Sequence, residues 1–491
     1  MGTPGARDGA ARLTVCLTLS FAHRYNPRVI TAPDLTRLFS PRSVAIAGAS
    51  ATVDSPGHDY VHSLRVFGFE GEVYPISRSA TEVDGYRAYA SLDDVPGEVD
   101  LVISCLPSSA VLGLVAQCAA KRVPFLHLFT GRFSETGDAE AADLERRLLA
   151  ACEEGGVRLL GPNGLGLYHP GGRIAFRPDL PREAGGVAFL SQSGNNAVEV
   201  ALRGNARGLR FGKVANYGNG LDLTPARLLA YLADDPETTV IGAYVEGVPD
   251  GRAFFEACKQ AAARKPVIIH KAGRTAAGAK SASSHTAALA GSAQLWSAAL
   301  RQAGAKEARS QEQLLDLMVA AALLPKASGR RMAIVGGGGG RSVQSADAAE
   351  ENGFEVVPLP DAVREQVRAK APMLADWVGN PVDQSILAGS GLSSNGLLEL
   401  MLADDAYDVA IANVGEDWFL GRPGGGDRLK HACNRLAAIA ANSPKPVAVV
   451  LGATETNEPE YRQVLDEVRD TLIARGLAVF PSVERAAWAM G

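Results

Sequence analysis

The stretch Gly186-Val-Ala-Phe-Leu-Ser-Gln-Ser-Gly194 decides the fold class of this chain. Its short apolar run predicts a buried strand, the Ser- and Gly-rich part a turn, and the residues up to about Arg207 a helix. Ser43-Val-Ala-Ile-Ala-Gly48 and Arg331-Met-Ala-Ile-Val-Gly336 begin the same pattern elsewhere in the chain. Strands that alternate with helices predict an α/β fold, with doubly wound parallel sheets covered by helices on both faces.

A chain of 491 residues is too long for one hydrophobic core, so we expect several domains. We divide it into an N-terminal tail (1–33), a Rossmann-like domain (34–160) and two flavodoxin-like domains (161–327 and 328–491). Strands are expected at 43–47, 71–76, 99–105 and 125–129, then at 186–190, 211–215, 240–245 and 267–270, and finally at 331–335, 409–413, 447–451 and 478–480.

Composition excludes several classes of protein. The net charge of −5 gives no electrostatic case for binding nucleic acid or an anionic membrane. No apolar run has the length of a transmembrane helix, and the run Leu13–Ala22 lacks the cleavage pattern of a signal peptide. The six cysteines are scattered, which indicates a reducing compartment, and we expect a cytoplasmic protein without a metal cluster.

His285 is the first candidate for chemistry. It lies in the Ala-, Gly- and Ser-rich stretch 271–291, which we expect to be a long loop that can move. An imidazole is one of the few side chains that can accept a phosphoryl group and pass it on. The alternative is a solvated loop histidine.

Two further features could serve such chemistry. Ser191-Gln192-Ser193-Gly194 offers hydroxyl and N–H groups where a strand turns into a helix, and a helix N-terminus attracts anions. The alternative is that a serine only caps the helix. Glu246 follows the strand expected at 240–245, at the sheet edge where α/β sites form. Its alternative is a solvated glutamate.

Four motifs in order carry a family resemblance across residues 35–490. They are Ser191-Gln-Ser-Gly194, Tyr244-Val-Glu-Gly247, Ser284-His-Thr286 with Leu289-Ala-Gly291, and Gly379-Asn-Pro-Val-Asp383. With them the chain resembles the α subunits of the ADP-forming acyl-CoA synthetases, in the succinyl-CoA synthetase superfamily. The resemblance implies a CoA-binding domain followed by two flavodoxin-like domains. The family also has an ATP-grasp portion, for which this chain has no room, so a separate ATP-grasp β subunit and an oligomer are implied.

The implied reaction is acid + CoA + ATP ⇌ acyl-CoA + ADP + phosphate, through an acyl phosphate and a phosphohistidine. The resemblance makes His285 the phosphoryl carrier and Glu246 the carboxylate that orients its ring. It assigns phosphate binding to Ser191, Gln192, Ser193 and Gly194. ATP or ADP with magnesium would bind the partner subunit, and the acyl group is not specified.

Binding of CoA is implied for three segments that follow strands. Gly48-Ala49-Ser50-Ala51 matches the family turn near the CoA phosphates, and Leu106-Pro107-Ser108 matches the segment along the CoA. Arg78 stands where the family often has a lysine, and its planar fork differs from an ammonium. For each segment the alternative is tight-turn packing.

Departures from the family keep a second class of function open. Asn195 and Asn196 replace a small apolar pair, which favours a CoA- or acyl-CoA-binding regulatory or scaffold protein as the alternative. A NAD-linked dehydrogenase is disfavoured, because Ser77 and Arg78 stand where an acidic residue would bind the ribose. The glycines 336–340 lack the Lys-Ser/Thr of a Walker A loop.

Overall fold

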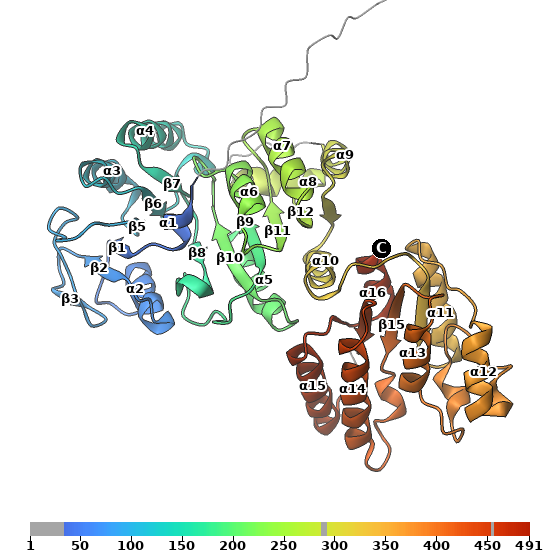
Figure 1. The fold of residues 1–491 in the computed structure, drawn as a ribbon. Helices are drawn as coiled ribbons and strands as arrows, with labels where there is room; N and C mark the ends of the chain where they lie inside the picture. Colours follow the sequence, from blue (N-terminus) through green and yellow to red (C-terminus); the bar gives the residue numbers. More distant parts are fainter. Residues whose placement is uncertain (1–33, 286–291, 453–455) are drawn as a thin grey trace, which may run out of the picture.

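The computed structural model describes residues 34–285, 292–452 and 456–491, with the side chains of 282–285 excepted. Three parallel-stranded sheets follow one another along the chain, each with its own helices (Figure 1). The first two lie side by side, and the third, drawn in orange and red, lies beyond α10 (Gln311–Leu323). The expected strands coincide with observed ones to within two residues at each end.

The first sheet has the order β2-β1-β5-β6-β7, all parallel. Its strands are β1 (Ser43–Ala47), β2 (Glu72–Ile76), β5 (Leu101–Ser104), β6 (Phe125–Leu128) and β7 (Arg158–Leu160). Its helices are α1 (Thr36–Phe39), α2 (Pro56–Phe67), α3 (Val111–Ala120) and α4 (Ala139–Gly155), with 3₁₀ turns η1 (Ser108–Ala110) and η2 (Ser134–Thr136). A small hairpin pairs β3 (Glu82–Val83) with β4 (Tyr86–Arg87).

The second sheet has the order β13-β12-β11-β9-β10-β8, and only β8 is antiparallel. Its strands are β8 (Gly166–Tyr168), β9 (Val187–Ser191), β10 (Phe211–Asn216), β11 (Val240–Val245), β12 (Val267–Lys271) and β13 (Lys306–Ala308). Helices cover both faces: α5 (Gly194–Asn205) contacts α10, while α7 (Gly251–Ala262) contacts both α6 (Pro225–Asp234) and α9 (Ala293–Ala303). The 3₁₀ turn η3 spans Pro170–Gly172.

The third sheet has the order β14-β15-β16-β17, all parallel. Its strands are β14 (Met332–Val335), β15 (Val409–Asn413), β16 (Val447–Val450) and β17 (Val479–Phe480). Its helices are α11 (Gly339–Glu351), α12 (Asp361–Lys370), α13 (Ser394–Ala403), α14 (Gly425–Ala441), α15 (Pro459–Ala474) and α16 (Val483–Met490), with η4 (Pro372–Leu374), η5 (Gln384–Leu387) and η6 (Glu416–Trp418). Contacts between α10 and α16 join this unit to the second sheet.

The stretch that we expected to be a long loop contains a helix, α8 (Ala276–His285), so that expectation was wrong. Alanine has the highest helix propensity of all residues, and this stretch is rich in it. Thr275 begins the helix, because its hydroxyl accepts a hydrogen bond from the N–H of Gly278 at 3.1 Å. A stretch whose small side chains offer little surface for packing can therefore still form a helix.

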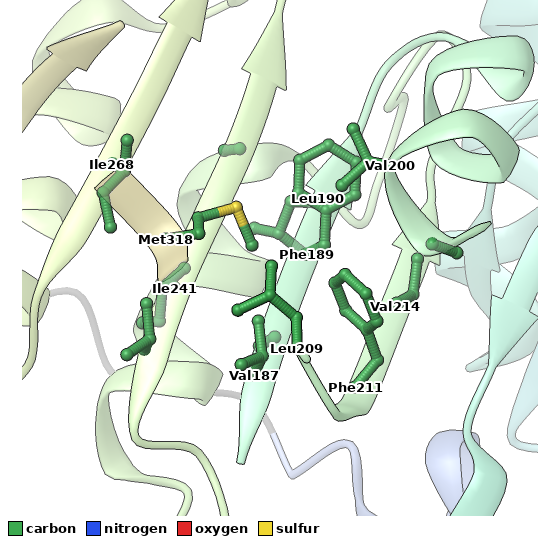
Figure 2. Packing of buried hydrophobic residues seen from close by; sticks show 14 of the residues in the cluster. Val187, Phe189, Leu190, Val200, Leu209, Phe211, Val214, Ile241, Ile268 and Met318 are labelled. Atoms are coloured by element: carbon green, nitrogen blue, oxygen red, sulfur yellow. The ribbon is translucent and has the colours of Figure 1, made fainter. Parts of the chain in front are cut away.

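The central core lies between the second sheet and its helices. Phe189, Leu190 and Phe211 from β9 and β10 pack with Leu209 and Met318 (Figure 2). Gly242 in β11 leaves the space that Met318 fills, since a Cβ atom there would lie 2.6 Å from the Met318 sulfur. This packing holds the ends of β9 and β11 in a rigid frame.

None of the described helices has the length and apolar character needed to cross a lipid bilayer.

Candidate functional site

Two of the three segments expected to bind CoA meet at one point of the first sheet. β2 lies on one side of β1 and β5 on the other, so the strand order reverses between β1 and β5. Ligands of open α/β sheets bind at such a switch point, beyond the carboxyl ends of the strands. Gly48–Ala51 follow β1 and Leu106–Ser108 follow β5 at this point. Arg78 follows β2 at the same edge, and its side chain is exposed.

Glycine is required at two positions of this edge. Gly48 has φ +86°, and a Cβ atom there would lie 3.1 Å from the backbone carbon of Cys105. A Cβ atom on Gly57, in the first turn of α2, would lie 2.1 Å from the Gly48 oxygen. The N-terminal turn of α2, capped by Ser55, therefore packs directly on the Gly48 turn. This cradle of backbone beside a helix N-terminus suits the phosphates of CoA.

The segment expected to bind phosphate forms the turn between β9 and α5. Ser193 caps α5, since its hydroxyl accepts a hydrogen bond from the N–H of Asn196 at 3.5 Å. The Ser191 hydroxyl donates to the carbonyl oxygen of Ser193 at 2.6 Å, and its side chain is buried. Gly194 is the first residue of α5, so the turn places the helix N-terminus at the sheet edge.

Gln192 joins this turn to the segment that contains Glu246. β9 and β11 are neighbours, and the order reverses there because β10 lies on the other side of β9. The Gln192 side-chain oxygen accepts hydrogen bonds from the N–H groups of Glu246 at 2.9 Å and Gly247 at 3.2 Å. The Gln192 N–H donates to the Tyr244 carbonyl oxygen at 3.1 Å. The serine turn and Glu246 are thereby held as one unit at the switch point.

Aromatic and cationic groups surround the half-buried Glu246. Burial raises the pKa of Tyr217, and the negative charge of Glu246 raises it further. Burial and the same carboxylate also raise the pKa of Tyr244. Burial lowers the pKa of Lys271, while Glu246 acts in the opposite direction. Glu246 thus lies within electrostatic reach of two phenols and one buried ammonium.

His285 is the last residue of α8, and its side chain lies outside the described part of the structure. α8 contacts η2 (Ser134–Thr136) of the first unit. η2 follows β6 at the carboxyl edge of the first sheet. The helix that ends at His285 therefore reaches from the edge of the second sheet toward the edge where Gly48 and Leu106 lie.

Three side chains that build this site could not be chosen from the sequence. Asn216, buried at the end of β10, donates to the Ser191 carbonyl oxygen at 2.8 Å and accepts from the Leu165 N–H at 2.5 Å. Tyr217 is fully buried, and its hydroxyl lies 3.5 Å from the Tyr244 carbonyl oxygen. Lys271 is buried at the end of β12. Polar residues at the ends of two parallel strands, β10 and β12, were the available signal.

A tight turn joins the two edges. Gly218, just after β10, has φ +53°, and a Cβ atom there would lie 2.2 Å from the Pro162 carbonyl oxygen. The Asn163 N–H donates to the carbonyl oxygen of Thr130 beyond β6 at 3.0 Å. The turn 161–166 therefore contacts the carboxyl edges of both sheets and sets their separation.

The other expectations concern metals and the third sheet. Among residues 34–285, 292–452 and 456–491, no group of three or more His, Cys, Asp or Glu side chains could hold a metal ion. Gly336, Gly337 and Gly338 form the turn between β14 and α11, and Gly339 and Gly340 begin α11. Gly336 has φ +91°, and its Cβ position lies 1.9 Å from the Asn413 oxygen. The close packing of the Gly336 backbone explains why this position needs glycine, and no bound nucleotide is required for that explanation.

Comparisons with known proteins agree on one family. Residues 42–170 match the CoA binding domain model, and residues 184–321 match the succinyl-CoA ligase like flavodoxin domain model. The α subunit of ADP-forming acetate–CoA ligase II from Pyrococcus furiosus is 33% identical over 425 residues, which cover 86% of this chain and 91% of that one. ADP-forming acetate–CoA ligase I from Archaeoglobus fulgidus is 38% identical over 382 residues, 77% of this chain but 54% of that longer one.

A solved structure gives the same result. Acetyl-coenzyme A synthetase 1 of Candidatus Korarchaeum cryptofilum, determined with phosphate and ADP, superimposes with a TM-score of 0.80 at 30% identity. The match covers 93% of this chain and 95% of that one. The chain therefore belongs to the family of ADP-forming acyl-CoA synthetase α subunits, which are acid–thiol ligases of the succinyl-CoA synthetase type.

Proposed function

We propose that this chain is the CoA-binding, phosphohistidine-bearing subunit of an ADP-forming acyl-CoA synthetase. In the direction of ATP synthesis, phosphate attacks the acyl carbon of acyl-CoA, and CoA leaves as the thiolate. A ring nitrogen of His285 then takes the phosphoryl group from the acyl phosphate and releases the acid. ADP finally takes the phosphoryl group from His285 and becomes ATP.

The observation that carries this proposal is the bond between Gln192 and the backbone of Glu246 and Gly247. This bond supports the proposal because it joins the N-terminus of α5, which would bind an anion, to the segment of Glu246, which would orient an imidazole. The contact of α8 with η2 adds that the helix ending at His285 reaches toward the expected CoA edge. Ser191 and Ser193 would hold phosphate, and Glu246 would hold the N–H of the histidine ring.

CoA would lie along the carboxyl edge of the first sheet. Gly48–Ala51 and the N-terminus of α2 would receive its phosphates, and Leu106–Ser108 would lie along its length. The exposed Arg78 would pair with a phosphate through its guanidinium.

A partner would complete the reaction. The Pyrococcus relative is named as an α subunit, and this chain spans about half of the longer Archaeoglobus relative. We propose that the partner is an ATP-grasp β subunit, which would bind ADP or ATP with magnesium. The acyl substrate would be a carboxylic acid of unspecified class.

The test is phosphorylation of the purified chain mixed with its ATP-grasp partner and Mg-ATP, without CoA. We expect the intact mass to rise by one phosphoryl group that is stable to base and labile to acid. The His285→Ala variant should gain no phosphoryl group, while His431→Ala, which changes an exposed histidine of α14, should gain it normally. Normal phosphorylation of His285→Ala would contradict the proposal. CoA binding without any phosphorylation would favour the regulatory or scaffold protein instead.

A further inference from the structure

Lys271 is an unusual residue for its position. It ends β12, and only 1% of its surface is exposed, which places it among the largest fully buried side chains of the described chain. Lysine is almost never fully buried without a specific partner, because removing its charge from water is costly. The buried ammonium of Lys271 therefore needs partners within the protein.

Its contacts lie on both flanks of α8. The ammonium donates a hydrogen bond to the carbonyl oxygen of Ala272, where the chain leaves β12 toward α8. It also lies 5.3 Å from the ring centroid of Trp296 in α9, the helix that follows α8 in the chain. Trp296 packs on Phe254 of α7 with ring centroids 5.4 Å apart. One ammonium thus connects the residues before and after the helix that ends at His285.

The same ammonium lies within electrostatic reach of Glu246. Val245 and Lys271 are paired across β11 and β12, so Glu246 comes directly after the residue opposite Lys271. The negative charge of Glu246 favours the charged form of Lys271, and the positive charge of Arg274 opposes it. The attraction between opposite charges is stronger beside a buried group such as Lys271 than in bulk water.

We propose that Lys271 is a positioning residue of the phosphoryl-transfer site, whose buried ammonium attracts the Glu246 carboxylate and contacts both flanks of α8. It touches no reacting atom and acts through Glu246, Ala272 and Trp296. This inference rests on the proposed function, because it gives Glu246 and His285 the roles stated there.

The experiment uses the chain in complex with its ATP-grasp partner, and it measures the rate of phosphoryl incorporation from Mg-ATP. Lys271→Met keeps the length and apolar stem but removes the charge. We expect it to slow incorporation by about 10- to 100-fold, because a small displacement of an orienting group has an effect of that order. Lys271→Arg should restore part of the rate. The matched control, Lys259→Met on the exposed side of α7, should react as the wild type does.

A second arm tests whether Lys271 acts through Glu246. Glu246→Gln removes the carboxylate charge and slows incorporation by itself. In that background we expect Lys271→Met to change the rate by no more than about twofold, since residues that act as a unit have non-additive effects. If the loss of rate in the double variant equals the product of the losses in the two single variants, the inference is overturned, and Lys271 has only a structural role.

Hydrogen exchange separates failure of this inference from failure of the proposed function. In Lys271→Met we expect faster exchange of the backbone amides of α9, with unchanged exchange in β1 and β5. No phosphorylation of the wild type would refute the proposed function, while exchange would still report on the contacts. Wild-type incorporation together with wild-type exchange in Lys271→Met would overturn the inference. If Lys271→Met does not fold, Trp296→Leu removes the ring contact and is judged by the same two measurements.

Discussion

Gln192 and Glu246 are held together across neighbouring strands by side chain and backbone. The Gln192 oxygen accepts the N–H groups of Glu246 and Gly247 at 2.9 and 3.2 Å, and the Gln192 side chain is buried. The serine turn after β9 and the backbone of Glu246 after β11 are therefore held together. The expectation that Gln192 binds phosphate stays a prediction, whereas its contact with the Glu246 backbone is observed.

Replacing Gln192 by Leu should destabilise the protein and slow phosphorylation together. Two backbone N–H groups lose their acceptor, and a buried donor left without a partner costs about 1–3 kcal/mol in the free energy of unfolding. Denaturant unfolding and the phosphorylation rate measure the two effects. Gln463→Leu, on an exposed site of α15, is the control and should change neither. Unchanged stability in Gln192→Leu would show that the pairing does not hold the turn.

Gly48→Ala should weaken CoA binding specifically. Gly48 and Gly85 share φ +86°, so alanine at either position carries the same left-handed strain of about 1–2 kcal/mol. Only Gly48 lies at the carboxyl edge of the first sheet, with its Cβ position 3.1 Å from Cys105, while that of Gly85 has nothing within 4 Å. Isothermal titration with CoA should show weaker binding for Gly48→Ala and wild-type binding for Gly85→Ala. Equal affinities would place CoA elsewhere.

Ser193→Ala should show whether the serine is more than a helix cap. Ser193 caps α5 and Ser310 caps α10 in the same manner, through a backbone N–H three residues on. Losing either cap should lower the free energy of unfolding by about 1 kcal/mol. Only Ser193→Ala should also slow phosphoryl incorporation, because only that hydroxyl lies beside the proposed phosphate. Similar rates of phosphoryl incorporation in Ser193→Ala and Ser310→Ala would show that Ser193 acts only as a helix cap.

The third sheet should lose stability in acid through Asp408. The Arg331 side chain donates to both Asp408 oxygens, at 2.9 and 2.8 Å, and Ser328 donates a further bond. These bonds hold the pKa of Asp408 well below its usual range. A carboxyl with a depressed pKa in the folded state stabilises the fold above its unfolded pKa of about 3.9, and the contribution fades as pH falls further.

Asp408→Asn should therefore lower the melting temperature at pH 7, and its difference from the wild type should shrink below about pH 4. Thermal unfolding followed by tryptophan fluorescence across pH 3–8 measures this. Asp470→Asn, an exposed carboxylate of α15, is the control. A difference between Asp408→Asn and the wild type that does not vary with pH would contradict the charge-based explanation.

Particular elements show how far sequence patterns reach. β11 was predicted with its exact bounds, because Val240–Val245 is a continuous apolar run of the kind that a parallel sheet buries on both faces. β7, β8 and β13 have three residues each, too few to show a period, and they were not predicted. α8 was mistaken for a loop because its small residues give no apolar stripe, although alanine favours helix.

The candidate site likewise contains residues that the sequence pattern could predict and residues that it could not. The serine turn, Glu246 and the Gly48 turn could be named from the sequence, because each directly follows a predictable strand. Asn216, Tyr217 and Lys271 could not, because their importance lies in what they touch. Each becomes part of the site only when β10, β9, β11 and β12 come to lie side by side.

The sequence by itself determined the α/β class, the positions of most strands and the residues that follow them, since local apolar runs and turn residues act over a few positions. Only the tertiary structure decided that Gln192 bonds the Glu246 backbone, that Lys271 is buried against Trp296, and that α8 reaches η2. Those contacts join residues from 25 to about 150 positions apart. They depend on strand order and helix packing, which no local pattern of residues encodes.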